Sequence, residues 1–403
     1  MSRTNSTGSE RSHAADTAMR QEQEQVTGSV GKQAHAPKLK VAIVHDWLVG
    51  GGAERVVEQL HKMYPEAPIY TSYCSDEWRK KLDDKVVTGY LQHWPFSGLR
   101  KFIPILRIWW FTHLDFSGYD LVISSSGNGE AKGVRTSKDT LHVCYCHSPT
   151  HFYWRHYYQY LKNPGFGVLN PLARLGLKIL AGPLRRWDYK AAQRPNYFIA
   201  NSNHIKKDIQ KYYDRDAVVI HPPVDTDRFK KVDQKKREGF VTVGRQVPFK
   251  HTDIIVDACR KLFKPLKVIG RGPEHAKLIK KIDSSISFDE HASDDAVNNY
   301  LANAEAFIFA AHEDFGITPV EAMAAGTPII AYKAGGALDY VNKSTGVFFD
   351  EQTSESLQKA LVSFNASKFD HREIKKEAEK FSVVNFQKNI REFLHLVTNK
   401  EKK

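Results

Sequence analysis

Short runs of apolar residues recur along the chain and are separated by segments with helical periodicity. Apolar runs of this length, without polar alternation, are typical of parallel strands buried on both faces. Their alternation with helices predicts repeated βα units. The pattern therefore predicts an α/β protein with two doubly wound, Rossmann-like sheets. The predicted strands lie at 39–44, 120–126, 141–146, 197–202 and 217–220, and then at 239–243, 266–269, 285–288, 306–310 and 327–331.

The pattern breaks once in the middle of the chain, where Pro222 and Pro223 favour a stiff, extended segment. This segment divides the chain into two predicted domains, 38–222 and 223–381, followed by a last amphipathic helix in 382–403. The 403 residues are enough for two domains of ordinary size. Residues 1–37 are rich in Ser, Gln, Glu and Thr and almost lack large apolar side chains, so we expect them to be disordered.

Composition narrows the class of partner. The net charge of +13 suits nucleic acid, an anionic membrane surface or acidic small substrates. Neither a zinc-finger spacing nor a basic low-complexity block is present, which argues against nucleic acid. Four cysteines make no disulfide framework and fit a reducing cytoplasm. No run approaches the roughly 18 apolar residues of a spanning helix, and the N-terminus has no signal-peptide core.

Two carboxylates, Glu313 and Glu321, flank a glycine-bearing turn after the predicted strand 306–310. Thr318 is predicted to be the N-cap of a short helix, with Pro319 as its first residue. Glu321 then completes a capping box, which by itself needs no ligand. The backbone N–H groups at the helix start also suit an anion such as phosphate. Spacing alone leaves the structural and the functional interpretation open.

Other polar side chains and glycines follow predicted strands, at the sheet edge where parallel sheets bind ligands. Gly51 and Gly52 lie between the first strand and a helix, and permit close approach of a ligand. Ser126 and Lys132 follow the second strand and are expected to face the ligand cleft. His147 follows the third strand, directly before a proline-fixed turn.

In the second half, Arg245 and Lys250 follow the strand 239–243. A fixed Arg and Lys can stabilise the negative charge that builds on a leaving phosphate. Surface charge is the plain alternative in a chain with 59 basic residues. Gly270 ends the next strand.

These segments together resemble a known family. Glu313 to Gly326, followed by Pro328 and Gly335-Gly336, resembles the E-x7-E signature of the retaining glycosyltransferases of family 4, which have the GT-B fold. The Gly50–Gly52 loop with Arg55, the His147-Ser148-Pro149 segment, and Gly244-Arg245 with Lys250 resemble further family motifs. The resemblance covers about residues 39–395. It implies two Rossmann-like domains facing across a cleft, with the last helix crossing back to the first domain.

The resemblance also implies roles for individual residues. Arg245 and Lys250 would bind the donor diphosphate, Glu313 the sugar and Glu321 the ribose, while His147 would orient the sugar. Further donor contacts are implied for Gly51, Gly52, Gly270, Phe315, Gly316, Ile317 and Thr318, and an acceptor-side position for Arg55, Ser126 and Lys132. No cofactor or metal is expected, because the two Asp-x-Asp triplets lie in the linker and in a turn.

The implied activity is retaining transfer of a hexosyl unit from a nucleoside-diphosphate sugar to a glycan or lipid-linked acceptor, in cell-surface polysaccharide or glycolipid synthesis. Similarity to bacterial polysaccharide mannosyltransferases favours GDP-mannose over a UDP-sugar. A sugar-nucleotide epimerase or hydrolase on the same fold is the main alternative. A non-catalytic basic membrane-binding protein is a third.

Two stretches, 94–116 and 166–187, combine basic residues with aromatic and aliphatic ones. Such amphipathic segments either lie in a membrane interface or pack on their own sheet. The sequence leaves both interpretations open. We expect a cytoplasmic protein, and in the first interpretation it would be peripheral on the inner face of the cell membrane.

Overall fold

The computed structural model describes residues 39–99, 104–162, 164, 167–230, 232 and 236–401. Residues from Lys40 onward form one compact unit. The disorder predicted for residues 1–37 concerns a segment outside the described residues, as do parts of the basic stretches, at 100–103 and at 165–166.

The first sheet is parallel, with strand order β3-β2-β1-β4-β5-β6-β7. Its three central strands are buried along their whole length, which accounts for their near-continuous apolar sequence. The strand order reverses between β1 and β4, so their carboxyl ends flank a switch point of the kind that binds ligands. The strands are β1 (Val41–His45), β2 (Ile69–Thr71), β3 (Val86–Val87), β4 (Leu121–Ser126), β5 (Leu141–Cys146), β6 (Tyr197–Ala200) and β7 (Val218–Val219).

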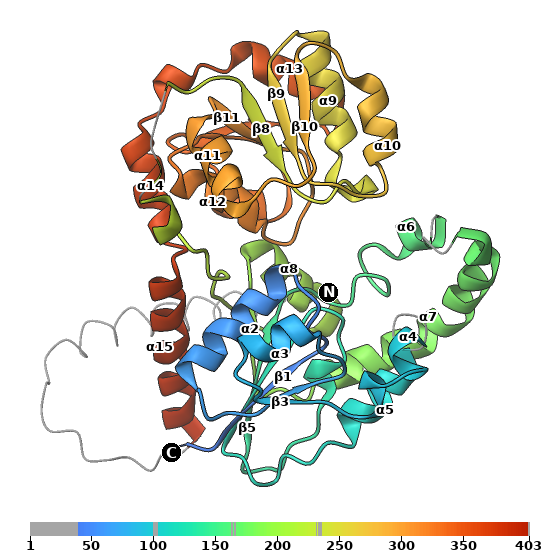
Figure 1. Cartoon of the computed structure of the whole chain (residues 1–403). Helices are drawn as coiled ribbons and strands as arrows, with labels where there is room; N and C mark the ends of the chain where they lie inside the picture. The colour runs from blue at the N-terminus through green and yellow to red at the C-terminus, as the bar shows by residue number, and fades with distance from the viewer. Residues whose placement is uncertain are drawn as a thin grey trace, which may run out of the picture. The chain divides into compact units, whose positions relative to one another are not determined.

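The second sheet is also parallel, with order β10-β9-β8-β11-β12-β13 and a reversal between β8 and β11. Both sheets and their helices can be followed in Figure 1. The strands are β8 (Phe240–Val243), β9 (Leu266–Ile269), β10 (Ile286–Asp289), β11 (Ala306–Phe309), β12 (Ile329–Tyr332) and β13 (Gly346–Phe349).

Helices cover both faces of each sheet. One apolar cluster joins the second sheet to α11, α12 and α14, and another joins its opposite face to α9 and α13. The α-helices are α2 (Gly52–Met63), α3 (Asp76–Lys81), α4 (Phe96–Leu99), α5 (Pro104–Thr112), α6 (Tyr157–Lys162), α7 (Asn170–Ala192), α8 (Asn203–Tyr213), α9 (Thr252–Lys261), α10 (His275–Leu278), α11 (Asp294–Asn303), α12 (Ile317–Ala324), α13 (Ser354–Ser363), α14 (His371–Glu379) and α15 (Val383–Glu401).

Helix α15 packs with the first sheet, although it follows the second in sequence. Phe386, Ile390 and Phe393 are buried in the same apolar cluster as Val56 and Leu60 of α2. The Gln387 side chain also donates a hydrogen bond to Gln59 of α2 at 2.9 Å. The last helix therefore ties the C-terminus to the first sheet.

The predicted fold class is confirmed: there are two parallel, doubly wound sheets. The sequence pattern missed β2, β3 and β13. The first two have three and two residues, too few to show a period, and β13 lies at a sheet edge with its two middle residues only half-buried.

Candidate active site

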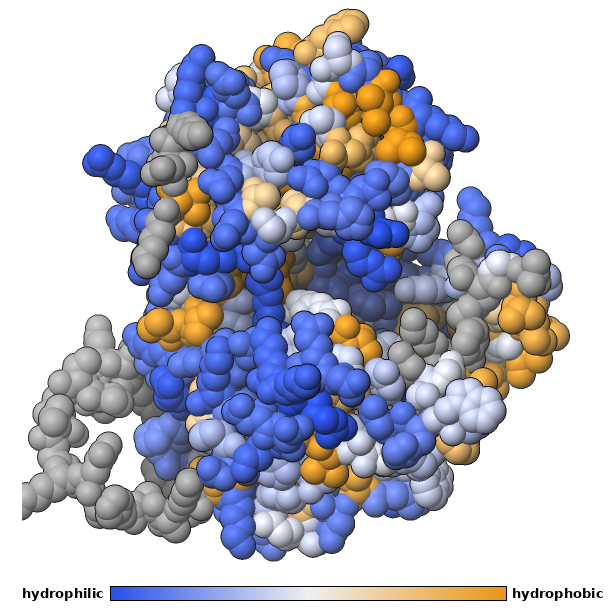
Figure 2. All heavy atoms as spheres, in the orientation of Figure 1, coloured by the Kyte–Doolittle hydropathy of each residue, from blue (hydrophilic) through white to orange (hydrophobic). Residues whose placement is uncertain are grey.

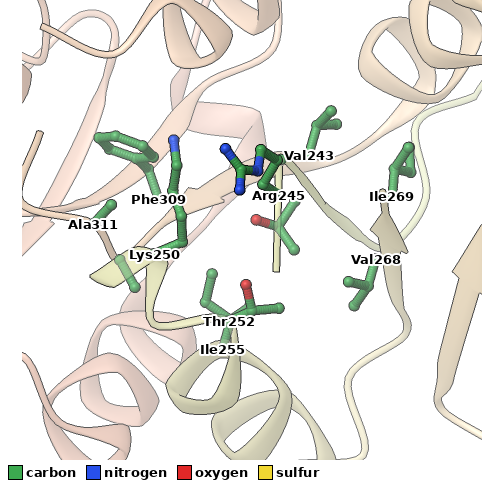
Figure 3. Close-up of a pocket in the computed structure, with 12 residues that line it drawn as sticks. Val243, Arg245, Lys250, Thr252, Ile255, Val268, Ile269, Phe309 and Ala311 are labelled. Carbon is green, nitrogen blue, oxygen red and sulfur yellow. The ribbon is translucent and has the colours of Figure 1, made fainter. Parts of the chain in front are cut away.

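A pocket lies at the switch point of the second sheet, beyond the carboxyl ends of its strands. Figure 3 shows Arg245 and Lys250 extending toward the same side of this pocket. Its lining comes from β8, β9 and β11, the turn after β8, and the first residues of α9: Thr242, Val243, Gly244, Arg245, Lys250, Thr252, Ile255, Val268, Ile269, Phe309, Ala310 and Ala311. The two cations therefore face the edge of the sheet at which α/β proteins bind ligands.

The two cations have different surroundings. The Lys250 ammonium pairs with the Glu313 carboxylate, and both side chains are about a quarter exposed. Arg245 is exposed. Neither is buried, so both remain accessible to an anion that enters the pocket.

The loop from Glu313 to Gly316 is held in place by close packing of glycines. A Cβ atom on Gly335 would collide with the Glu313 carbonyl, and one on Gly336 would collide with the Phe315 backbone. The Gly336 N–H also donates to the Glu313 carbonyl at 2.9 Å. Gly316 has a φ of 87°, a left-handed conformation that favours glycine. The backbone position of Glu313 is thus fixed independently of its side chain.

The predicted start of α12 is wrong. The helix begins at Ile317, its N-cap is Gly316, and no side chain caps it. Thr318 is therefore a helical residue rather than the cap, and Glu321 completes no capping box. The cause is the left-handed conformation of Gly316, which starts the helix one residue after the glycine.

Glu321 pairs instead with two arginines. It is buried to 5% exposure and accepts from Arg55 Nη1 at 2.7 Å, with Arg228 Nη2 at 3.1 Å. Arg55 lies on α2, directly after the glycine loop. The residue predicted for the acceptor side thus contacts the carboxylate predicted to bind the ribose.

The glycine loop before α2 is shaped by Glu54. Its carboxylate accepts hydrogen bonds from the N–H groups of Gly50 at 3.0 Å and Val49 at 3.3 Å. A Cβ on Gly52 would lie 2.9 Å from the Ile317 side chain. Gly52 therefore meets the start of α12, where donor contacts are also predicted.

His147 lies after β5, at the switch point of the first sheet. Its Nε2 lies 2.8 Å from Ser125 Oγ, which is itself 3.1 Å from His45 Nδ1. Burial, and then the neighbouring His45, lowers the pKa of His147 to about 3. The imidazole is therefore neutral near pH 7, and its ring can exchange hydrogen bonds but carries no charge.

A chain of hydrogen bonds joins His147 to the loop that carries Glu313. Asn201 Nδ2 donates to the His147 carbonyl at 2.9 Å, and Ser202 Oγ donates to Asn201 Oδ1 at 3.1 Å and to the Asp314 carbonyl at 2.5 Å. Arg155 Nη1 donates to the Asp314 carboxylate at 2.6 Å. His147 and Glu313, which are far apart in sequence, are thus brought into one network.

The Asp314 carboxylate is paired with two basic side chains. His151 Nε2 lies 3.3 Å from its carboxylate, and Arg155 bonds both Asp314 and Asp208. Burial alone would raise the pKa of Asp314, but His151 and Arg155 together hold it below its usual value. The Asp314 carboxylate is therefore ionised at neutral pH.

Lys132 does not face a ligand cleft, contrary to the prediction. Its side chain is 1% exposed, and its ammonium donates to Asp188 at 2.5 Å and to the Gly129 carbonyl at 3.0 Å. Ser126 is 1% exposed, and its hydroxyl has no hydrogen-bond partner within the part of the chain that the structure describes. Both residues follow a strand, but they point into the domain.

Gly270 is needed for backbone packing. It has a φ of 106°, and a Cβ there would collide with the Gly244 carbonyl. The glycine therefore lets the turn after β9 close on the turn that carries Arg245, which supports the pocket without contacting a ligand through a side chain.

The site can now be set beside known proteins. Residues 50–228 match the family model described as Glycosyltransferase Family 4, and residues 223–381 match Glycosyl transferases group 1. The two matches meet where the chain passes from the first sheet to the second. Over residues 50–381 the chain is therefore similar to glycosyltransferases.

Curated relatives match this chain over limited lengths. The chain is 31% identical over 140 residues to a D-inositol 3-phosphate glycosyltransferase of Mycobacterium sp. (strain JLS), and the match covers 29% of this chain and 32% of that protein. It is 25% identical over 187 residues to the D-rhamnosyltransferase WbpZ of Pseudomonas aeruginosa, covering 42% and 48%. The matched part spans about a third to a half of these relatives.

Solved structures share the fold of this protein over nearly the whole chain. Anabaena Alr3699/HepE in complex with UDP has a TM-score of 0.64 at 17% identity, covering 89% of this chain and all of that one. Sucrose-phosphate synthase of Thermosynechococcus elongatus has a TM-score of 0.65 at 13% identity, covering 90% and 100%. Likeness at this identity shows the GT-B architecture alone.

Sequence reasoning missed several residues of the site. Asp46 is 1% exposed and accepts from three backbone N–H groups, those of Gly127, Asn128 and Ala131, each at 2.7 Å. It thereby fixes the loop after β4. The signal in the sequence that could have identified Asp46 was an acidic residue directly after the buried strand β1. Arg155 gave no comparable signal, because it lies among bends and turns with no period.

Proposed function

We propose that this protein transfers a hexosyl unit from a nucleoside-diphosphate sugar to a glycan or lipid-linked acceptor, with retention of configuration at the anomeric carbon. The single observation that carries the proposal is the pocket after β8, in which Arg245 and Lys250 face the carboxyl ends of the strands. Two flexible cations at that edge suit a diphosphate, which carries its charge on several oxygens.

The cations have a defined role in the proposed reaction. The bond from the anomeric carbon to the β-phosphate oxygen breaks, and a bond to the acceptor oxygen forms on the same face of the sugar. Negative charge grows on the departing phosphate, and Arg245 and Lys250 stabilise it. The acceptor proton passes to the leaving phosphate oxygen, so atoms and charges balance without a separate protein base.

Entry of the donor requires the ion pairs of the site to be exchanged. Lys250 is paired with Glu313. A donor phosphate that pairs with the Lys250 ammonium releases the Glu313 carboxylate. The carboxylate can then accept a hydrogen bond from a hydroxyl of the sugar. Binding of the phosphate and binding of the sugar are coupled in this way. Neutral His147 contributes a hydrogen bond from the other sheet, because its ring carries no charge near pH 7.

Related proteins support a nucleotide-sugar donor. Solved structures with the same fold hold UDP or UDP-glucose, and one curated relative is a D-rhamnosyltransferase. The His147-Ser148-Pro149-Thr150 segment and the Gly50–Gly52 loop resemble bacterial polysaccharide mannosyltransferases. We therefore expect GDP-mannose to be used in preference to a UDP-sugar, in polysaccharide synthesis.

The test is a thermal-shift panel of GDP-mannose, UDP-glucose and other nucleotide sugars, followed by product analysis with a saccharide acceptor. A donor at about 100 times its dissociation constant should add about 2.7 kcal/mol of stability. Anomeric configuration is then measured by NMR on the product. Inverted product, or conversion of the donor alone into an epimer without any acceptor, would overturn the proposal.

The expected independence from metal is tested in the same assay. Arg245 and Lys250 supply the charge that a divalent cation would supply elsewhere, so turnover should be unchanged when EDTA is added. Loss of activity in EDTA that returns with a divalent cation would contradict this part of the proposal and leave glycosyl transfer itself intact.

A further inference from the structure

The first half of α7 presents an apolar face to the outside. Leu172, Leu175 and Ile179 have relative exposures of 68%, 55% and 63%. Spacings of three and four residues place them on one side of the helix. The buried residues Ala181, Leu184 and Asp188 repeat the same spacing nine positions later. Nine residues make about 2.5 turns, so the exposed face is opposite the packed one.

This arrangement reverses the usual pattern of a surface helix, in which the face away from the core is polar. A Cβ placed on Gly176, on the same half of the helix, would meet no other atom within 4 Å. Figure 2 shows hydrophobic side chains gathered on the surface over α7. Nothing in the described part of the chain covers this face.

The charges around the face all have one sign, apart from one buried acid. From residue 157 to residue 192 the sequence contains six basic residues, and Asp188 is the only acidic one. Asp188 is fully buried and paired with Lys132. The outer charges of α6 and α7 are therefore basic: Lys162, Arg174, Lys178, Arg186 and Lys190 are exposed.

A second element repeats the feature. Ile105 and Trp109 of α5 are each 53% exposed, and Trp94 shortly before it is 85% exposed. No Asp or Glu occurs from residue 94 to residue 112. Helices α5 and α7 both contact the turn Ala131–Gly133, so they belong to one side of the first domain. Exposed tryptophans are typical of membrane interfaces, where one end of the ring is apolar and the other wet.

We infer that the outer face of α7, together with α5, docks the protein on an anionic lipid bilayer. Leu172, Leu175 and Ile179 enter the boundary between headgroups and acyl chains, and the flanking lysines and arginines contact lipid phosphates. The helix lies along the surface, since no described helix is long and apolar enough to cross a membrane. Charge selects this occupant: a neutral bilayer or a second copy of a basic chain offers no counter-charge to these cations.

The inference goes beyond glycosyl transfer and is tested without turnover. The full chain is sedimented with unilamellar vesicles of phosphatidylcholine, with and without about 30% phosphatidylglycerol. Each buried leucine or isoleucine contributes about a factor of ten or more to partitioning. The double substitution Leu172→Glu and Ile179→Glu should therefore lower the vesicle partition coefficient about a hundredfold or more, while thermal unfolding stays unchanged because both side chains are exposed.

The matched control is Val362→Glu, at a residue on α13 that is 70% exposed. It should bind vesicles like the wild type. A second set, Lys178→Gln with Arg186→Gln and Lys190→Gln, removes three charges and should weaken binding to anionic vesicles about a hundredfold, at about fivefold per charge. Substituting the exposed Lys280, Lys359 and Lys368 in the second domain should have a much smaller effect.

Three outcomes would overturn the inference. The first is equal binding to neutral and anionic vesicles, and the second is undiminished binding of the Leu172→Glu and Ile179→Glu protein. The third is a wild-type dimer in light scattering that these substitutions convert to a monomer, since the apolar face of α7 would then be an interface between two copies of the chain. Loss of glycosyl transfer activity, by contrast, would not affect the result.

Discussion

Two lysine–carboxylate pairs, one in each domain, show how differently the same chemistry can be used. Lys132 and Asp188 are 1% and 0% exposed, and the pair is surrounded by further partners. Thr150, Trp154 and Tyr213 all donate to the same carboxylate, at 2.7–2.9 Å. Lys250 and Glu313 are 26% and 21% exposed, at a pocket. The first pair connects α7 and α8 with the loops that follow β4 and β5. The second pair can exchange partners.

The comparison teaches that burial, rather than residue type or position after a strand, separates a structural cation from one that can bind a ligand. Burial alone would lower the pKa of Lys132, but Asp188 outweighs it and raises that pKa, so the ammonium stays charged inside the protein. A charge held there has no access to a ligand. The accessible Lys250 can leave its carboxylate for a phosphate.

Breaking the buried pair should have the largest effect. Asp188→Ala leaves the Lys132 charge unpaired in the interior, which should cost about 3–5 kcal/mol of unfolding free energy. Equilibrium urea unfolding measures it. Replacing both partners by apolar residues, Lys132→Met with Asp188→Leu, should recover much of the loss. A single variant within about 1 kcal/mol of the wild type would contradict a structural role for the pair.

Breaking the accessible pair should affect turnover instead. Lys250→Ala and Arg245→Ala should each lower kcat/KM about 10²–10³-fold, because each removes charge stabilisation of the leaving phosphate. Unfolding free energy should change by less than about 1 kcal/mol, as expected for an exposed pair. Lys359→Ala, an exposed lysine of the same domain, serves as the control. Retained activity in both site variants would refute the role of the cations.

Acid should weaken the first domain through its buried imidazoles. Burial, and then Arg194 and Arg215, lowers the pKa of His142 to about 3. The unfolded chain takes up a proton near pH 6.5 and the folded one does not, so stability falls as the pH drops below that value. Between about pH 7 and 5 the loss should be about 2 kcal/mol for this residue.

His142→Asn removes that titration and should flatten the pH dependence of urea unfolding by the same amount. His142 lies on β5 and is fully buried, and its Nε2 lies 2.8 Å from Ser124 Oγ on the neighbouring strand β4. An unchanged slope between wild type and variant would show that this imidazole does not carry the acid sensitivity.

The smallest expected effect concerns Glu321, whose burial lies between those of the two pairs. Glu321→Gln should cost about 1 kcal/mol, because Arg55 is partly exposed and keeps its hydration. It should also raise KM for the donor if the carboxylate holds the ribose. Glu313→Gln should lower kcat without changing stability, since the Glu313 backbone is held by Gly336 and not by its side chain. Equal stability losses in the two variants would contradict this distinction.

The fold was predictable because buried parallel strands leave a direct trace in sequence. The buried strands β1, β4, β5 and β11 each contain a run of apolar residues, and the prolines at 222 and 223 lie between the two sheets. Arg245 and Lys250 were predicted for the same reason, because the end of a buried strand can be located to within a residue or two.

The helix at Ile317 was not predictable to the residue. Thr318, Pro319 and Glu321 satisfy the local rules for a helix start, but the left-handed φ of Gly316 sets the start two residues earlier than Pro319. Glu321 is then used by Arg55, 266 positions away in sequence. Sequence rules for helix starts consider only neighbouring residues, so they do not predict a partner this far away in the chain.

The pattern of apolar residues was enough to predict two doubly wound sheets and the cations Arg245 and Lys250, because these depend on strand burial and on the residues directly after each strand. The contacts formed on folding set which of the polar residues after those strands reach the surface. Folding buried Lys132 with Asp188, left Lys250 and Glu313 accessible, and turned the apolar face of α7 outward. The physical reason is that a side chain's exposure is set by the neighbours that the whole fold brings to it.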